Sequence, residues 1–337
     1  MVNWRRWLIA IVVIIGLGFA VHFGFNFPWT STWSALKTSS WLLLAAASLA
    51  HLVSLAVKGG EWFVFLRRLA PVRFAAAQYA TFVGAAVACF TVSVSGDAAR
   101  AKAVAIRGEV SIGAAIGSLV LARFVEIMSL LVFLAVALIV APPFHSASLI
   151  GLGLGLITGA VFLGYRRLPW ARIRSRTLGP WRGPLVEMVS STDRMGMVAA
   201  VALACFNWLL QWAAFHWTIA ATHTTVHLSI SLSALVAANA AGLLRLTPGN
   251  FGVLQGSLIL VMEQFGVPPA SALAAGLALQ AVQVIPVLVI GIGLTGLRGL
   301  GQLLRKSTPL ELSPTDRETG PGKGERRDLG GEDSAFS

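Results

Sequence analysis

The sequence predicts an all-α polytopic membrane protein, with about six spanning helices and two re-entrant helical hairpins arranged as an inverted repeat. Two observations carry the first part of this prediction. Of the 337 residues, 56% are hydrophobic and only 12% are charged. The apolar residues also form long unbroken runs, several of them close to the ~20 residues that cross a bilayer as a helix. Such a composition is typical of membrane proteins and not of a large soluble domain.

The first apolar run covers 7–25 and follows a basic start, as in a secretory signal peptide. Residues 18–20 faintly resemble a cleavage site. The run nevertheless continues to Phe25 with only His22 interrupting it, which favours a retained signal-anchor helix over a cleaved peptide. We therefore count it as the first spanning helix.

Basic residues mark the cytoplasmic side of the predicted helices. The net charge of +12 comes from lysines and arginines that gather between apolar runs, where the positive-inside rule explains them. A nucleic-acid partner is therefore not predicted. The basic groups lie at 5–6, 58–73, 100–107, 166–194 and 298–327.

Two apolar segments cannot be simple spans if all these groups are cytoplasmic. The run 74–95 has basic residues on both flanks, so 74–111 is predicted to enter from the cytoplasm and return as a re-entrant hairpin. By the same logic, 229–266 enters from outside and turns at the Pro-Gly-Asn break at 248–250. Six full spans remain, at 7–25, 41–57, 112–141, 148–165, 196–221 and 270–297.

Three spans per half give the two halves opposite orientations, which is the inverted-repeat plan of secondary transporters. We predict the first repeat at 1–141, the second at 142–300 and a disordered tail at 307–337. Both termini are then cytoplasmic, in a bacterial-type inner membrane. The alternative is eight plain spans, which leaves at least one basic loop outside.

The break in the second hairpin is the first candidate site. Irregular backbone at membrane depth is tolerated only where it is buried in protein or lines a watery cavity. The helix that follows the break is predicted to present its N-terminus to an anion. Arg245 lies just before the break and favours this interpretation over a solvated external loop. The other candidate residues here are Pro248, Gly249, Asn250 and Gly252.

The first hairpin and the span after it hold further candidates. Gly96 ends an apolar arm, Asp97 can cap the next helix, and Arg100 lies one turn later. Alternatively, Asp97 only caps and Arg100 only marks the membrane boundary. Arg123 and Glu126 are stronger candidates, because ionisable groups at their depth in a spanning helix are functional by default. They lie three residues apart on one helix face, and a purely structural ion pair is the alternative.

Other polar residues carry weaker signals. Asn207, Gln211 and His216 lie along the span 196–221 and are predicted to form hydrogen bonds between helices rather than to bind a ligand. His223 and His227 share a helical spacing but have no evident third ligand, so metal binding is not predicted.

Several chemistries lack their sequence motifs. Cys89 and Cys205 lie far apart in apolar stretches and provide neither a disulfide framework nor metal-ligand spacing. There is no phosphate-binding loop and no hydrolase motif, so an ATP-driven pump or a standard hydrolase is not supported. We predict no metal, no cofactor and no catalytic residue.

Two segments resemble a known family. In 93–131, "SVSGDAARAKAVAIRGEVSIGAAIGSLVLARFVEIMSLL" is similar to a Gly-Asp/Glu motif with Arg three residues on, followed by a span carrying Arg-x-x-Asp/Glu. In 246–280, "LTPGNFGVLQGSLILVMEQFGVPPASALAAGLALQ" is similar to Pro-Gly-x-x-Gly-x-x-Glu-Gly, then "FGV" and an Ala-rich helix. Both patterns belong to the flippase-like family built on the transmembrane domain of bacterial lysylphosphatidylglycerol synthases. The matching residues are Gly96, Asp97, Arg100, Arg123, Glu126, Pro248, Gly249, Gly252 and Gly256.

The resemblance implies a stand-alone membrane domain that moves a lipid between leaflets. In the full synthases this domain is joined to a cytoplasmic domain that transfers an amino acid from aminoacyl-tRNA to phosphatidylglycerol. Here about 40 residues follow the last predicted span, too few for such a domain. A separate lipid-modifying enzyme is therefore a candidate partner.

Three positions depart from the family pattern. Ser93 or Ser95 stands where the first motif often has Pro, Gln255 replaces the usual Glu, and Gln280 occupies a position where Arg is common. The last two changes remove an acid and a base. The substrate charge or the ion coupling is therefore expected to differ from the family norm.

These observations together predict an inner-membrane lipid translocator that is not an enzyme. Its cavity would open sideways to lipid and bind an anionic or phosphate-bearing headgroup, because fixed donors must replace the water that a charge loses. The predicted donors are the helix N-termini and Arg100, Arg123 and Arg245. One alternative is an integral-membrane transferase or accessory protein acting on a lipid-linked substrate. The other is a small-solute secondary transporter.

Overall fold

The computed structural model describes residues 27–91, 95–108, 110–140, 194–222, 224, 226–242 and 247–306. Within these residues every regular element is a helix, which confirms the predicted fold class. The chain is a multi-pass membrane protein. Four described helices are long and apolar enough to cross a membrane: α3 Trp41–Leu66, α6 Ile112–Val140, α9 Arg194–Ala221 and α12 Pro269–Lys306.

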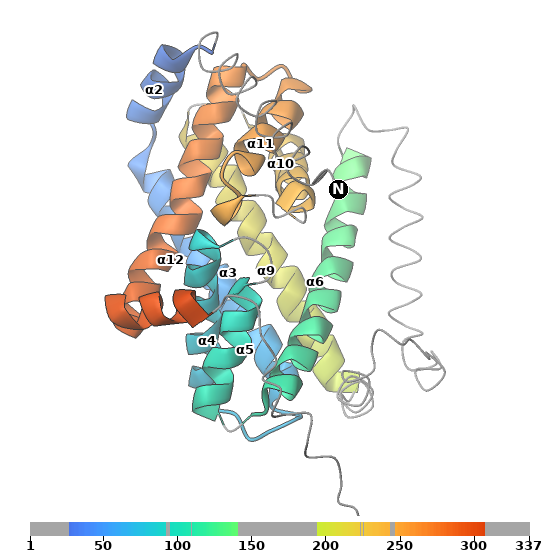
Figure 1. Cartoon of the computed structure of the whole chain (residues 1–337). Helices are drawn as coiled ribbons and strands as arrows, with labels where there is room; N and C mark the ends of the chain where they lie inside the picture. The colour runs from blue at the N-terminus through green and yellow to red at the C-terminus, as the bar shows by residue number, and fades with distance from the viewer. Residues whose placement is uncertain are drawn as a thin grey trace, which may run out of the picture.

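These four helices correspond to four of the six predicted spans. The predicted spans 7–25 and 148–165 and the predicted tail 307–337 lie outside the described residues. Helix α12 turns at Gly296, whose φ is 68°, and its last part runs across the bundle instead of along it (Figure 1). A short helix, α2 Trp29–Lys37, packs against the start of α12, where the Thr32 hydroxyl donates to the carbonyl oxygen of Ala270 at 3.2 Å.

Helix α3 is longer than the sequence predicts. The prediction that this span ends at Val57, with Lys58 in a cytoplasmic loop, is wrong, because the helix continues to Leu66. Trp62, Phe65 and Leu66 are fully buried in a core shared with α6, α9 and the helices of the first predicted hairpin, and this packing favours the extra turns. Lys58 therefore lies inside the helix bundle.

The first predicted hairpin is present as two short helices, α4 Phe74–Phe90 and α5 Ser95–Gly108. Their lengths of about 26 and 21 Å are below the ~30 Å of a hydrocarbon core. They approach at backbone distance, since a Cβ added to Gly84 would lie 2.7 Å from the carbonyl oxygen of Gly96. Because α5 already begins at Ser95, Asp97 lies in its first turn and is not the preceding cap that the sequence predicts.

The second predicted hairpin comprises α10 Leu228–Gly242, the 3-10 turn η5 Pro248–Asn250 and α11 Val253–Glu263. The chain breaks where predicted, and Gly249 and Asn250 take φ values of 58° and 57°, which glycine and asparagine adopt most readily. The ring nitrogens of Trp212 and His216 on α9 lie 3.0 and 3.1 Å from the Ser231 hydroxyl on α10. The interhelical bond predicted for His216 is therefore confirmed.

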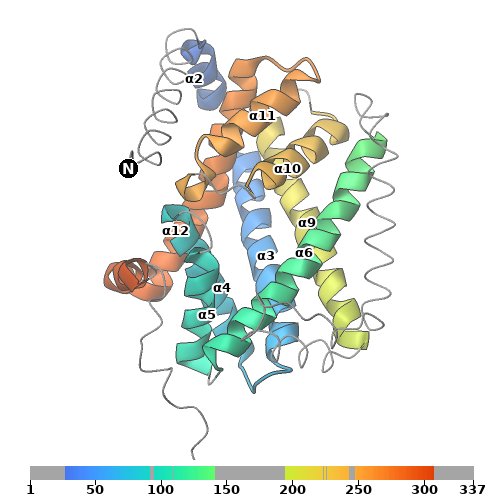
Figure 2. The same cartoon turned by 45° about the vertical axis from the view of Figure 1, so that its right-hand side comes forward.

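The two hairpins lie toward opposite ends of the long helices, and their tips meet near the middle (Figures 1 and 2). A Cβ added to Gly249, at the tip of the second hairpin, would lie 2.9 Å from the carbonyl oxygen of Cys89 on α4. Each hairpin has its own apolar core, one shared with α3 and α6 and the other with α9 and α12. An inverted repeat requires this arrangement, while the repeat boundaries at 1–141 and 142–300 stay a prediction.

Candidate binding site

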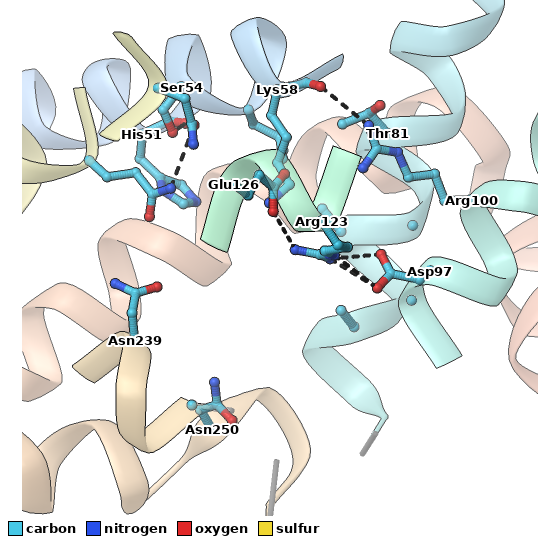
Figure 3. A pocket seen from close by; sticks show the side chains of 18 of the residues that line it. His51, Ser54, Lys58, Thr81, Asp97, Arg100, Arg123, Glu126, Asn239 and Asn250 are labelled. Atoms are coloured by element: carbon cyan, nitrogen blue, oxygen red, sulfur yellow. Dashed lines mark hydrogen bonds and ion pairs between the residues drawn. The ribbon is translucent and has the colours of Figure 1, made fainter. Parts of the chain in front are cut away.

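A cavity of about 390 Å³ lies between the two hairpins, where their tips meet. Helices α3, α4, α5, α6, α9 and α10 and the turn η5 all contribute to its wall. Its polar side chains face one another across the space between these elements (Figure 3). Seven of the residues predicted from the sequence line it: Gly96, Asp97, Arg100, Arg123, Glu126, Gly249 and Asn250.

Arg123 on α6 is the centre of the charged part of the wall (Figure 3). Its guanidinium donates to both carboxylate oxygens of Asp97 on α5, with Nη2 to Oδ1 at 2.7 Å and Nε to Oδ2 at 3.2 Å. Its Nη1 donates to Oε2 of Glu126 at 2.8 Å, so the predicted Arg123–Glu126 pair is confirmed. Arginine suits this position, because its planar fork can serve two carboxylates at once.

Lys58 on α3 completes the network. Its Nζ lies 2.8 Å from Oε1 of Glu126, so one carboxylate joins two cations on different helices. The indole of Trp208 on α9 donates to the backbone carbonyl of Glu126 at 3.1 Å. Helices α3, α5, α6 and α9 are therefore all tied to one residue pair, Arg123 and Glu126.

Arg100 on α5 is held by a backbone carbonyl and an aromatic ring. It is buried, and its Nη2 donates to the carbonyl oxygen of Lys58 at 3.3 Å. Its guanidinium carbon lies 4.2 Å from the ring centroid of Trp62, a cation–π contact, and the Trp62 indole donates to the Ser118 hydroxyl at 2.9 Å. Arg100 thus contributes charge from the wall of the cavity, while aromatic packing fixes its position.

The wall carries more positive than negative charge. Three cations, Lys58, Arg100 and Arg123, line the cavity together with two carboxylates, Asp97 and Glu126. Glu61 is fully buried on α3, one turn beyond Lys58, but it is not a wall residue, and its carboxylate has no hydrogen-bond partner among the described residues. The surface that faces a ligand therefore has a net charge of +1, which favours an anion.

Several residues of the cavity wall are not among those predicted from the sequence. His51, Ser54 and Lys58 line the cavity from α3, and their spacing of three and four residues places them on one helix face. This spacing would have predicted the three residues as a group if the helix had been expected to continue past Lys58. Asn207 and Gln211 also line the cavity, and the bond between them is within α9 rather than between helices as predicted.

Some predicted site residues lie elsewhere. Arg245 is outside the described residues, and Pro248 begins the turn η5. The N-terminus of α11, predicted to face an anion, does not belong to the described cavity wall. Instead, the Gly252 N–H donates to Oε1 of Gln255 at 2.7 Å, so the amide that replaces the usual acid caps its own helix.

We expect Gln255→Glu to lower the melting temperature of the purified protein in detergent. Gln255 is buried, and its Nε2 faces the carbonyl oxygen of Gly276 at 3.5 Å. A carboxylate would keep the bond to Gly252 but place a charge against that carbonyl, at a cost of about 1–3 kcal/mol.

The double variant Gln255→Glu/Gln280→Arg is the matched test. Gln280 lies one turn after Gly276 on α12, on the same helix face, and is buried. An arginine there supplies the missing cation, so the double variant should be more stable than Gln255→Glu alone. A double variant that melts below both single variants would contradict the inferred pairing.

The model of the family described as the lysylphosphatidylglycerol synthase TM region matches residues 7–291 of this chain. The matched range includes both hairpins and every described residue of the cavity wall. No curated protein matches the chain.

Proposed function

Because the chain belongs to the family of the lysylphosphatidylglycerol synthase TM region, whose members are membrane proteins related to lipid handling, we propose that it moves a phosphate-bearing lipid between the two leaflets of a membrane. Its partners in this proposal are membrane lipids, and it makes no covalent change to them. We place it in a bacterial-type inner membrane with both termini in the cytoplasm.

The observation that supports this proposal most is the net positive cavity at the middle of the long helices. His51 and Lys58 on α3, Arg123 on α6 and Asn207 on α9 all lie well inside helices long enough to span a bilayer. An anionic headgroup cannot cross hydrocarbon alone, because it would lose its hydration without any compensation. The cations of the wall replace that water at the depth where the loss is largest.

The size of the cavity and the pairing of its acids also favour translocation. Small-ligand sites measure about 300–1,000 Å³, so a cavity of about 390 Å³ accommodates a headgroup while the acyl chains stay in the bilayer. A carboxylate that serves as the base of a transferase must be free to accept a proton. Both carboxylates of the described wall, Asp97 and Glu126, are instead held in ion pairs. His51 also lines the wall, so the assay must look for a lipid product as well.

A leaflet-exchange assay tests the proposal. The purified protein is reconstituted into vesicles that contain phosphatidylglycerol labelled on an acyl chain with nitrobenzoxadiazole, and dithionite then bleaches the outer leaflet. We expect the inner-leaflet label to be bleached as well when the protein is present. Lys58→Gln should slow the bleaching of the inner-leaflet label by about tenfold, because the variant loses about 1.4 kcal/mol of headgroup binding.

Arg107→Gln is the matched control. It also removes one positive charge, but Arg107 packs on the ring of Tyr79 and is not a wall residue. We expect it to leave the rate unchanged. No bleaching beyond that of protein-free vesicles, for any of several phospholipids, would overturn the proposal, and so would a donor-dependent lipid product, which indicates a transferase.

A further inference from the structure

Besides its ion pairs, the described cavity wall carries four amide side chains. Asn207 and Gln211 come from α9, Asn239 from α10 and Asn250 from η5. In Figure 3, Asn239 and Asn250 lie on the far side of the space from Arg123 and Asp97. The cavity therefore has a cationic part around Arg123 and a neutral part that includes Asn239 and Asn250 of the second hairpin, while Asn207 and Gln211 line its wall on α9.

These amides retain hydrogen-bonding capacity. Asn207 is fully buried, yet its Nδ2 has no hydrogen-bond partner among the described residues. Its Oδ1 lies 3.5 Å from Nε2 of Gln211, at the limit of a hydrogen bond. Asn239 donates to the carbonyl oxygen of Leu235 at 2.8 Å through Nδ2, which leaves its acceptor oxygen for other groups. A buried donor without a partner is costly, so a ligand that supplies an acceptor is favoured.

The same wall is unsuited to an amine. An ammonium group needs a carboxylate or an aromatic cage. Asp97 and Glu126 already bind Arg123 and Lys58, and Trp208 is the one aromatic residue among the described wall residues. The net positive charge of the wall repels a further cation.

We infer that the cavity selects a phosphate ester of an uncharged polyol, with the phosphate at Arg123 and Lys58 and the hydroxyl groups at the amides. Each hydroxyl both donates and accepts a hydrogen bond, which matches an amide that carries both functions. The inference rests on the proposed function and narrows its substrate to phospholipids with a glycerol or sugar headgroup. It disfavours headgroups that carry an amine, including aminoacylated ones.

The leaflet-exchange assay tests this headgroup selectivity with four acyl-chain-labelled lipids in otherwise identical vesicles. These are phosphatidylglycerol, phosphatidylinositol, phosphatidylethanolamine and lysyl-phosphatidylglycerol. We expect the two polyol lipids to be exchanged at least about tenfold faster than the two amine lipids. Equal rates for all four would overturn the inference while leaving translocation intact.

Two variants test the assigned residues. Asn207→Leu has nearly the same shape and removes a donor that has no partner, so the fold should persist while exchange of the polyol lipids slows toward that of the amine lipids. Asn250→Asp adds a carboxylate at a left-handed position that Asp tolerates, so it should raise the rate of phosphatidylethanolamine relative to phosphatidylglycerol. Gln264→Leu, which removes an exposed amide at the end of α11, is the control for both.

A soluble phosphate ester of a polyol has the same chemistry as the headgroup, so a further experiment separates the two sources. The same vesicles are given radiolabelled glycerol 3-phosphate and its uptake is measured. We expect no uptake. Uptake without lipid exchange would overturn lipid translocation and keep the polyol-phosphate chemistry. Unselective exchange of all four lipids, in which Asn207→Leu behaves as wild type, would overturn the polyol assignment alone.

Discussion

Replacing Arg123 with methionine is expected to abolish lipid exchange and to lower the free energy of unfolding by about 3 kcal/mol. Methionine is apolar and of comparable length, so the main change is the loss of charge and hydrogen bonds. Asp97 then loses its Arg123 hydrogen bonds, and Glu126 keeps Lys58 alone. This loss of unfolding free energy is at the lower end of the range for breaking a buried ion pair, because the Arg123 side chain is 35% exposed. Unfolding in detergent and the leaflet-exchange rate measure the two effects.

Two companion variants separate the structural role of Arg123 from its role in binding. Arg123→Lys keeps the charge but cannot bridge two carboxylates in the same geometry, so it should lose part of the stability and part of the exchange rate. The double variant Arg123→Met/Asp97→Asn removes both members of one ion pair and should recover stability without recovering exchange. Recovery of exchange in the double variant would show that Arg123 has only a structural role.

Replacing Gly249 with alanine is expected to be the most damaging small substitution in the second hairpin. A residue with a Cβ in the left-handed conformation of Gly249 costs about 1–2 kcal/mol by itself. Here the new Cβ would also lie 2.9 Å from the carbonyl oxygen of Cys89, which is backbone and cannot rotate away. The two hairpin tips must then separate, and both stability and exchange should fall.

Gly266→Ala provides the matched control. Gly266 follows α11 and also has a positive φ, 75°, but a Cβ there would meet nothing within 4 Å. The substitution therefore carries the conformational cost without the contact with the first hairpin. We expect the melting temperature to fall at least about twice as far for Gly249→Ala as for Gly266→Ala. Equal losses would mean that the contact with Cys89 contributes nothing.

The parts of the structure that depend on local sequence could be predicted. The interruptions predicted near Gly96 and at 248–250 follow from backbone chemistry and flanking charge, and the structure has a pair of short helices around each. Arg123 and Glu126 were predictable as a pair because their separation along one helix determines that they meet.

The remainder of the site depends on how the helices pack. A lysine that follows an apolar run looks the same in the sequence whether it lies at the membrane boundary or lines a cavity. Lys58 was therefore predicted in a cytoplasmic loop, although it lies within α3. The Asp97–Arg123 and Lys58–Glu126 pairs join different helices, and neither contact has a sequence separation that a pattern could reveal. The role of Gln255 was also not predictable. Its side-chain oxygen accepts a hydrogen bond from the Gly252 N–H, and a glutamate, the usual residue of the family at this position, could accept the same bond.

The pairing of Arg123 with two carboxylates also determines how tightly a headgroup can be held. A lipid phosphate that reaches Arg123 does not meet a bare cation, because it must take over hydrogen bonds from Asp97 or Glu126. Binding is then an exchange of one anion for another, and its free energy is the difference between two similar sets of contacts. A permeating species has to leave as readily as it enters, so shallow binding sustains rapid turnover. In the proposed translocation, Asp97 and Glu126 therefore compete with the lipid phosphate for Arg123 and re-form their ion pairs when the lipid leaves.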